Sequence, residues 1–327
     1  MKHGVLSMID LTVHPQQLER AVQRARENRI VIPTFAQMRD PALIPEAIKK
    51  QLRHVGLWDV NPLNLFRISW HNEPTMSGGA YGPVNFIELP SVLTGVKARI
   101  IVLCGKWFPT GCHKVGASFG CLAPRLVTGQ FDPTYNKAVW PSTGNYCRGG
   151  AYNSKLLGCE SVAILPAEMS KERFDWLSKI AGEVIATPGC ESNVKEIFDK
   201  TWELRRTRKD VVIFNQFEEM GNVLWHYQVT GKAIADAYES LKTGLTIPPT
   251  EQVEGGQLLA WGDRIMNAFP DDLRAGVRAE QKLLEERVPA LAENTWNREK
   301  LSDFAEFSTR YTRVTGLYEC FRTRQGQ

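Results

Sequence analysis

The 327-residue chain lacks an apolar stretch long enough to cross a membrane, and it has no long run of basic residues. Forty basic residues against thirty-six acidic ones leave a net charge of only +4. This balance gives nothing that could follow a phosphate backbone, so we expect neither a membrane nor a nucleic-acid partner. Asp10 interrupts the apolar start of the chain before a signal region is complete, which predicts a cytoplasmic protein.

Cysteine is also scarce and irregularly placed. The seven cysteines are odd in number and scattered along a long chain, which favours reduced thiols over a disulfide framework. Cys104, Cys112 and Cys121 lie around His113, but their spacing matches no zinc pattern, so we predict no metal site.

The composition is that of a globular protein. Hydrophobic residues make up 43% of the chain and charged residues 23%, which excludes a disordered protein. At roughly 150 residues per domain, the length predicts two domains.

The first hundred residues are interrupted by prolines and are predicted to be irregular. We expect helices over residues 16–28 and 42–54, and the run of β-branched residues at 99–104 predicts a first buried strand.

From residue 137 to residue 241 the pattern becomes regular. Short Val/Ile runs alternate with amphipathic segments, which predicts βαβ units and a mainly parallel, doubly wound sheet. We expect strands at 137–142, 161–166, 183–187 and 211–216, and helices at 146–157, 171–180, 193–206 and 222–241. Ser170 is a predicted N-cap, and Gly182 a predicted left-handed helix stop. Beyond residue 250 the Val/Ile runs disappear, and charged helices are predicted at 271–287 and 298–322.

Lys114 follows a Pro/Gly turn and begins a predicted helix. A lysine in this position can form a Schiff base with a carbonyl cofactor, because its neutral amine is a nucleophile. Taken alone, the segment fits a solvated surface lysine better, since most lysines are exposed.

A second candidate segment is the loop Ser142-Thr143-Gly144-Asn145, which links a predicted strand to a predicted helix. Backbone amides and short hydroxyls at a helix N-terminus attract anions, so this loop could hold a carboxylate. An ordinary strand-to-helix loop with a capping residue explains the same pattern.

Together the two segments, about thirty residues apart, resemble the cysteine synthase-like family of fold-type II pyridoxal-phosphate enzymes. This family includes serine and threonine dehydratases, cystathionine β-synthase and the tryptophan synthase β subunit. Its Pro-Thr-Gly-Ser-x-Lys turn here reads Pro109-Thr110-Gly111-Cys112-His113-Lys114, and its Ser/Thr-Ser/Thr-Gly-Asn loop reads Ser142-Thr143-Gly144-Asn145. Segments 165–189 and 215–231 match the family as well, so that the resemblance covers roughly residues 80–241.

The resemblance assigns a role to each matching residue. Lys114 would hold pyridoxal 5'-phosphate as an internal aldimine and exchange a proton at the substrate α-carbon. Asn145 would bind the phenolic oxygen of the cofactor. The substrate α-carboxylate would be bound by Ser142, Thr143 and Gly144, with Gln216 as a second contact.

The downstream part of the chain departs from the family pattern. The family carries a Gly-rich loop for the cofactor phosphate, whereas only Gly255 and Gly256 stand at the corresponding place, beside Glu254. Ser308 is the nearest candidate for the group that faces the pyridine nitrogen. Cys112 replaces the family's serine in the lysine turn.

The resemblance implies an α/β fold of two doubly wound domains with the cofactor in the cleft between them. Residues 1–116 and 221–327 would form the larger domain, and residues 117–220 the smaller, inserted one. The expected protein is a homodimeric enzyme, a lyase or transferase of amino-acid metabolism.

It would perform β-replacement or β-elimination on serine, O-acetylserine or cysteine through an aminoacrylate, and the lysine turn favours replacement. The alternative is a catalytically impaired relative, without the phosphate loop, that binds or regulates another protein.

One histidine and two tryptophans near the motifs are expected to have packing roles. We expect His226 to pack or cap within a helix rather than act in catalysis. Trp107 and Trp140 lie near the two motifs and are expected to pack a core or form the wall of a pocket.

Overall fold

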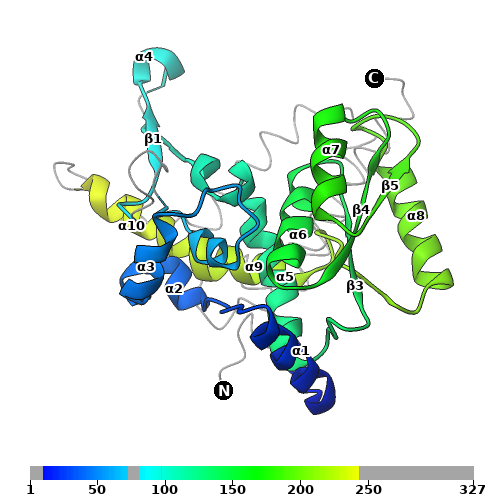
Figure 1. Cartoon of the computed structure of the whole chain (residues 1–327). Coiled ribbons are helices and arrows are strands. Elements are labelled where there is room, and N and C mark those ends of the chain that lie inside the picture. Colours follow the sequence, from blue (N-terminus) through cyan, green and yellow to red (C-terminus); the bar gives the residue numbers. More distant parts are fainter. Residues whose placement is uncertain (1–9, 73–80, 97, 243–327) are drawn as a thin grey trace, which may run out of the picture. The chain divides into compact units, whose positions relative to one another are not determined.

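A four-stranded parallel sheet forms the centre of the part of the chain that the computed structural model describes, residues 10–72, 81–96 and 98–242 (Figure 1). Its strands run in the order β5-β4-β3-β6 and are β3 (Lys137–Pro141), β4 (Glu160–Pro166), β5 (Glu183–Thr187) and β6 (Val211–Ile213). Every pairing is parallel. The α/β class with a parallel sheet is therefore confirmed.

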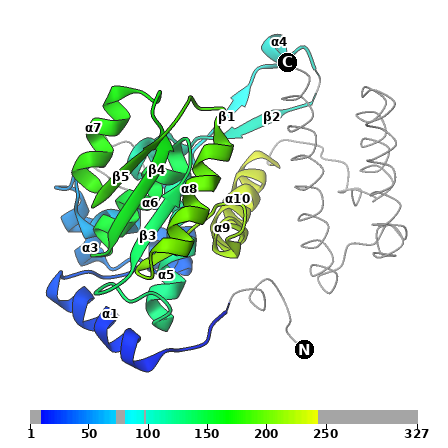
Figure 2. The same cartoon turned by 90° about the vertical axis from the view of Figure 1, so that its right-hand side faces the viewer.

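Helices connect the strands as the alternating pattern predicts. They are α6 (Asn145–Leu156), α7 (Lys171–Ile180) and α8 (Val194–Thr207). Ala138 and Trp140 face the main core with α6, while Val139 on the opposite face packs with Ile197 and Leu204 of α8. Figure 2 shows the sheet between α8 and α6. Trp140 is fully buried, as expected for a core residue.

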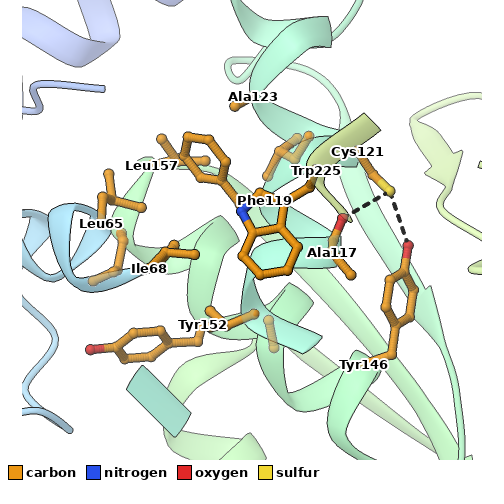
Figure 3. Close-up of a cluster of buried hydrophobic side chains, with 14 of the residues drawn as sticks. Leu65, Ile68, Ala117, Phe119, Cys121, Ala123, Tyr146, Tyr152, Leu157 and Trp225 are labelled. Carbon is orange, nitrogen blue, oxygen red and sulfur yellow. Dashed lines mark hydrogen bonds between the residues drawn. The ribbon is translucent and has the colours of Figure 1, made fainter. Parts of the chain in front are cut away.

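Helix α5 (Lys114–Thr128) is a largely buried helix next to the sheet. It packs against α6 and α9 (Met220–Trp225), and glycines make both contacts close. A Cβ on Gly116 would lie 2.1 Å from the ring of Trp225, and one on Gly120 would lie 2.3 Å from the carbonyl oxygen of Gly221. Figure 3 shows Trp225 among the buried side chains around Phe119.

The N-terminal region is a chain of short helices. Helix α1 (Pro15–Glu27) confirms the first prediction. The helix predicted at 42–54 is wrong in extent: the chain forms a single turn η2 (Pro41–Leu43) and then α3 (Glu46–Leu52). Pro45 explains the break, because it disfavours helical conformation in the residue before it. Helix α2 (Phe35–Arg39) and turn η3 (Pro62–Arg67) complete the region.

The strand predicted at 99–104 forms, but it is not buried. It is β2 (Ile100–Leu103), which pairs with β1 (Phe86–Leu89) in an antiparallel ribbon of two strands, joined through α4 (Ser91–Thr94). Ile100 and Val102 are exposed, because in the part of the chain that the structure describes β2 pairs with β1 alone.

Three local predictions need correction. The helix expected at 222–241 is divided into α9, a π-helical turn (His226–Thr230) and α10 (Gly231–Lys242). The helix before β5 ends at Ala181 in an extended conformation, and Gly182 is not left-handed. Ser170 occupies the N-cap position of α7, but its side chain accepts no capping hydrogen bond. In the described residues, no helix is long and apolar enough to span a bilayer.

Candidate functional site

Lys114 is presented by a sharp reversal of the chain. Turns η5 (Gly105–Trp107) and η6 (Pro109–Gly111) precede it, and both Thr110 and Gly111 have left-handed backbones, with φ of 66° and 70°. Thr110 is β-branched, so this conformation costs on the order of 1–3 kcal/mol and must be held by its surroundings. Its hydroxyl is buried without a partner among the described residues. The prediction that Lys114 begins a helix after a turn is confirmed.

One face of α6 packs against the start of α5. Asn145, Gly149 and Asn153 are spaced by four residues and therefore share this face. A Cβ on Gly149 would lie 2.8 Å from the Cα of Val115 and 3.1 Å from the carbonyl carbon of Lys114. The amide of Asn153 donates to Val115 O at 2.6 Å and to Ser118 Oγ at 2.9 Å.

Asn145 therefore lies on the face of α6 that meets Lys114, at the exposed end of the helix. The sequence interpretation missed Asn153. The four-residue spacing from Asn145 was the available signal for it.

The second predicted segment lies between β3 and α6, as expected. Ser142 is buried and its N–H donates to Ile164 O at 3.2 Å, which continues the β3–β4 ladder. The Gly144 N–H donates to Ser142 Oγ at 3.2 Å, and Asn145 then begins the helix. The loop therefore combines hydroxyl groups with a helix N-terminus, where the backbone amides favour an anion.

Gln216 lies at the same edge of the sheet as this loop. The register of β3 with β6 pairs Val139 with Ile213, and the Phe214 N–H still donates to Val139 O at 2.9 Å. Beyond Phe214 the chain leaves the strand, and Gln216 lies in a turn past the carboxyl end of β6. The carboxyl ends of parallel strands are the usual place for ligands in such sheets.

Two histidines lie beside Lys114. The ring of His113 stacks on Trp70 with centroids 5.8 Å apart and meets His226 edge to face at 5.6 Å. Nδ1 of His226 lies 3.0 Å from Thr230 Oγ1, which also accepts a hydrogen bond from Trp70 Nε1. Burial lowers the pKa of His226 to about 4, and the charges of His113 and Lys114 add to the effect. Burial also lowers the pKa of His113, and the charge of Lys114 lowers it further.

Both imidazoles are therefore neutral near pH 7, which limits the positive charge around the lysine. The packing role expected for His226 agrees with these contacts. His113 was not singled out as a site residue, and its position directly before Lys114 was the available signal.

The next residues to place are the cysteines and the other side chains that can bind a metal ion. The six cysteines in residues 10–72, 81–96 and 98–242 are free thiols, and no cluster of ligating side chains that could hold a metal ion occurs among these residues. Cys112, in the lysine turn, places its sulfur 3.9 Å from Nδ1 of His113.

The residues present fit a carbonyl cofactor in three respects. Lys114 is partly exposed, and no carboxylate of the described chain pairs with it. The Asn145 side chain is exposed on the face of α6 that meets Lys114. An anion-favouring loop precedes the same helix. The residues predicted for the phosphate and the pyridine nitrogen, Gly255, Gly256 and Ser308, lie outside the described residues.

Comparison with known proteins finds relatives for about half of the chain. A probable cysteine synthase of Bacillus subtilis is 28% identical over 163 residues, which are 50% of this chain and 52% of the relative. Cystathionine beta-synthase of Saccharomyces cerevisiae is 26% identical over 156 residues, 47% of this chain and 31% of that protein. The chain thus spans about half the length of the first relative and about a third of the second. No family model matches the chain.

Two solved structures are similar at lower identity. A hydrogen sulfide-producing enzyme from Fusobacterium nucleatum is 21% identical with a TM-score of 0.43, over 53% of this chain and 52% of the other. Cysteine synthase from Entamoeba histolytica is 19% identical with a TM-score of 0.42, over 47% of this chain and 46% of the other. These sequence relatives show that the chain is similar to the fold-type II pyridoxal-phosphate enzymes of the cysteine synthase type.

Proposed function

We propose that the chain is a pyridoxal-phosphate-dependent enzyme that performs β-replacement on an amino acid such as O-acetylserine or serine. One observation carries the proposal. The helix that Lys114 begins packs, through Val115 and Ser118, against the α6 face that carries Asn145. The loop Ser142–Gly144 leads directly into that helix.

Lys114 and Asn145 would hold the cofactor. The lysine amine would bond to the carbonyl carbon of pyridoxal phosphate, and the asparagine amide would donate to its phenolic oxygen. When bound, the cofactor supplies an electron sink for the electron pair left at the substrate α-carbon. Lys114, released by the incoming substrate amine, would take the α-proton as a general base.

The loop would orient the substrate. The hydroxyls of Ser142 and Thr143 and the N–H groups at the start of α6 would bind the α-carboxylate, with the Gln216 amide as a second contact. This fixes the α-carbon relative to Lys114, and such positioning lowers the entropic part of the barrier. Burial lowers the pKa of both His113 and His226, so neither imidazole adds a positive charge beside the lysine near pH 7.

The domain boundaries, the oligomeric state and the compartment are part of the same proposal. Residues 117–220 would form the smaller domain, and residues 1–116 with 221–327 the larger one. The resemblance suggests a homodimer, and the free thiols suit a reducing compartment such as the cytoplasm.

Activity with O-acetylserine and sulfide tests the proposal. The full-length protein, supplied with pyridoxal phosphate, should release a cysteine product, and Lys114→Ala should lower the rate by about 10³-fold because the general base is lost. The matched control is Lys106→Ala, which changes a lysine that lies over the Trp107 ring in η5. It should retain the rate.

Release of a keto acid and ammonia instead of cysteine would indicate elimination. No turnover by the wild-type protein and no visible cofactor band would contradict the enzyme proposal and favour the impaired relative.

A further inference from the structure

Arg148 is an arginine with an unusual environment beside the anion-favouring loop. It lies in the first turn of α6, and its backbone N–H donates to Gly144 O at 3.3 Å. The guanidinium carbon lies 5.2 Å from the ring centroid of Trp58 and 5.2 Å from that of Trp176. The two rings are nearly perpendicular, at 87°, and hold the guanidinium between them.

This guanidinium has no anionic partner in the described part of the chain. Its Nε is buried without a hydrogen-bond acceptor, and no described carboxylate lies within ion-pair distance. Burial lowers the pKa of Arg148, the charge of Arg173 lowers it further, and Glu172 opposes both. Buried donors are normally paired in native proteins, so this Nε has hydrogen-bonding capacity that no described residue uses.

Arg173 brings a second guanidinium to the same loop. It lies in the first turn of α7, and its NH1 donates to Thr143 O at 2.8 Å. No carboxylate of the described chain forms an ion pair with it. Both arginines contact the same loop, Arg148 through its backbone N–H to Gly144 O and Arg173 through its NH1 to Thr143 O, and the charge of Arg173 adds to the lowering of the pKa of Arg148. An anion between them would offset the repulsion between their charges.

Arg148 also lies near the lysine turn, through the ring of Trp58. A Cβ on Gly111, three residues before Lys114, would be 3.5 Å from the ring of Trp58. Trp58 therefore connects the arginine that it covers with the turn that presents the lysine.

We propose that Arg148 and Arg173 form a second anion site next to the Ser142–Gly144 loop, which binds an acidic group on the side chain of the amino-acid substrate. This group is a carboxylate or a phosphate, since guanidinium groups bind both in the same forked geometry. The site extends the proposed function, because the loop itself would take the α-carboxylate. It adds to the proposed function a preference for an amino acid with two anionic groups over one with an uncharged side chain.

Binding of matched amino acids to the full-length protein tests the site. L-aspartate and L-asparagine have nearly the same shape and differ by one charge, and O-phospho-L-serine and L-serine form the corresponding phosphate pair. Calorimetry and intrinsic tryptophan fluorescence report binding without turnover. We expect the acidic member of at least one pair to bind at least tenfold more tightly. The pair with the larger ratio identifies a carboxylate or a phosphate.

Two variants locate the binding. Arg148→Gln should reduce the ratio to below about twofold and leave the affinity for the uncharged member unchanged. The matched control is Arg205→Gln, which removes a guanidinium lying 4.7 Å from the exposed Trp202 ring on α8. It should keep the wild-type ratio. If Arg148→Gln does not fold, as judged by its thermal transition, Arg173→Gln gives the same test and the same expected loss.

Equal affinities within both pairs, or no binding of any probe, would overturn the proposal. So would a ratio that survives Arg148→Gln, or an equal weakening of both members. The titration does not depend on catalysis. A protein without activity that still discriminates within a pair refutes only the proposed function, and an active protein that does not discriminate refutes only the second anion site.

Discussion

The chain uses similar strand sequences in two very different places. Strand β2 reads Ile-Ile-Val-Leu in the β1–α4–β2 ribbon, and its outward-facing residues are exposed. Strand β4 contains Val-Ala-Ile-Leu, and all four residues are completely buried. The difference comes from the neighbours, because β4 has a strand on each side and helices on both faces. Burial is thus set by tertiary context rather than by the apolar run itself.

The two regions also differ in how closely other groups approach their glycines. Gly116, Gly120, Gly149 and Gly150 lie in α5 and α6, and a Cβ on any of them would meet another group within 2.8 Å. Gly95, at the end of α4 in the ribbon, has nothing within 4 Å of its Cβ position. The helices around Lys114 therefore have almost no freedom to shift, which suits a site that must hold several groups in fixed positions.

Gly120→Ala is expected to lower the free energy of unfolding the most. Its methyl group would collide with Gly221 O and the Cβ of Trp225, so that α5 and α9 must separate. We expect the free energy of unfolding to fall by about 3 kcal/mol, measured by urea denaturation. Gly95→Ala makes the same chemical change without a collision. Its loss should be about 1 kcal/mol, caused by the strain of an alanine in a left-handed backbone. Equal losses in both variants would contradict the close α5–α9 contact.

A smaller effect depends on pH. The folded protein holds the pKa of His226 near 4, below the value of about 6.5 in an unfolded chain. Between these values the unfolded state binds more protons, so the free energy of unfolding falls as the pH decreases from 6.5 towards 4. We expect this group to contribute about 2 kcal/mol of that fall.

Urea denaturation of His226→Gln at pH 7 and pH 4.5 checks this contribution. The variant should lose about 2 kcal/mol less between the two pH values than the wild type does. His54→Gln, at an exposed histidine, should retain the full wild-type dependence. A His226→Gln variant with the wild-type dependence would show that His226 is not held neutral by its burial.

The smallest effect is expected in the ribbon. Val92 in α4 is 93% exposed, so Val92→Ser removes almost no buried surface. The free energy of unfolding should change by less than about 0.5 kcal/mol. A loss above 1 kcal/mol would show that the ribbon is covered in the full-length protein.

The sequence was sufficient for the elements between residues 137 and 213, because strong periodicity and local propensity agree there. The lysine turn and the loop Ser142–Asn145 were also predictable in place, since turn residues mark the ends of regular elements. The exposure of β2 could not be predicted, because a run of four apolar residues looks the same whether or not helices or strands cover it.

Other parts of the site depend on contacts between distant segments. Trp58 and Arg148 are ninety residues apart, and nothing in either segment indicates that they meet. The division of the helix after residue 220 accompanies a distant contact, since the π-helical turn begins at His226, which meets His113 edge to face. Such pairings are tertiary and have no local sequence signal.

The central claim is that Lys114 is the residue that binds the cofactor. The most direct test is to incubate the full-length protein with pyridoxal phosphate, reduce it with borohydride and map the modified peptide by mass spectrometry. The account predicts a single reduced cofactor on Lys114, with no labelling at Lys106. A label on another lysine, or none on the wild-type protein, would contradict it.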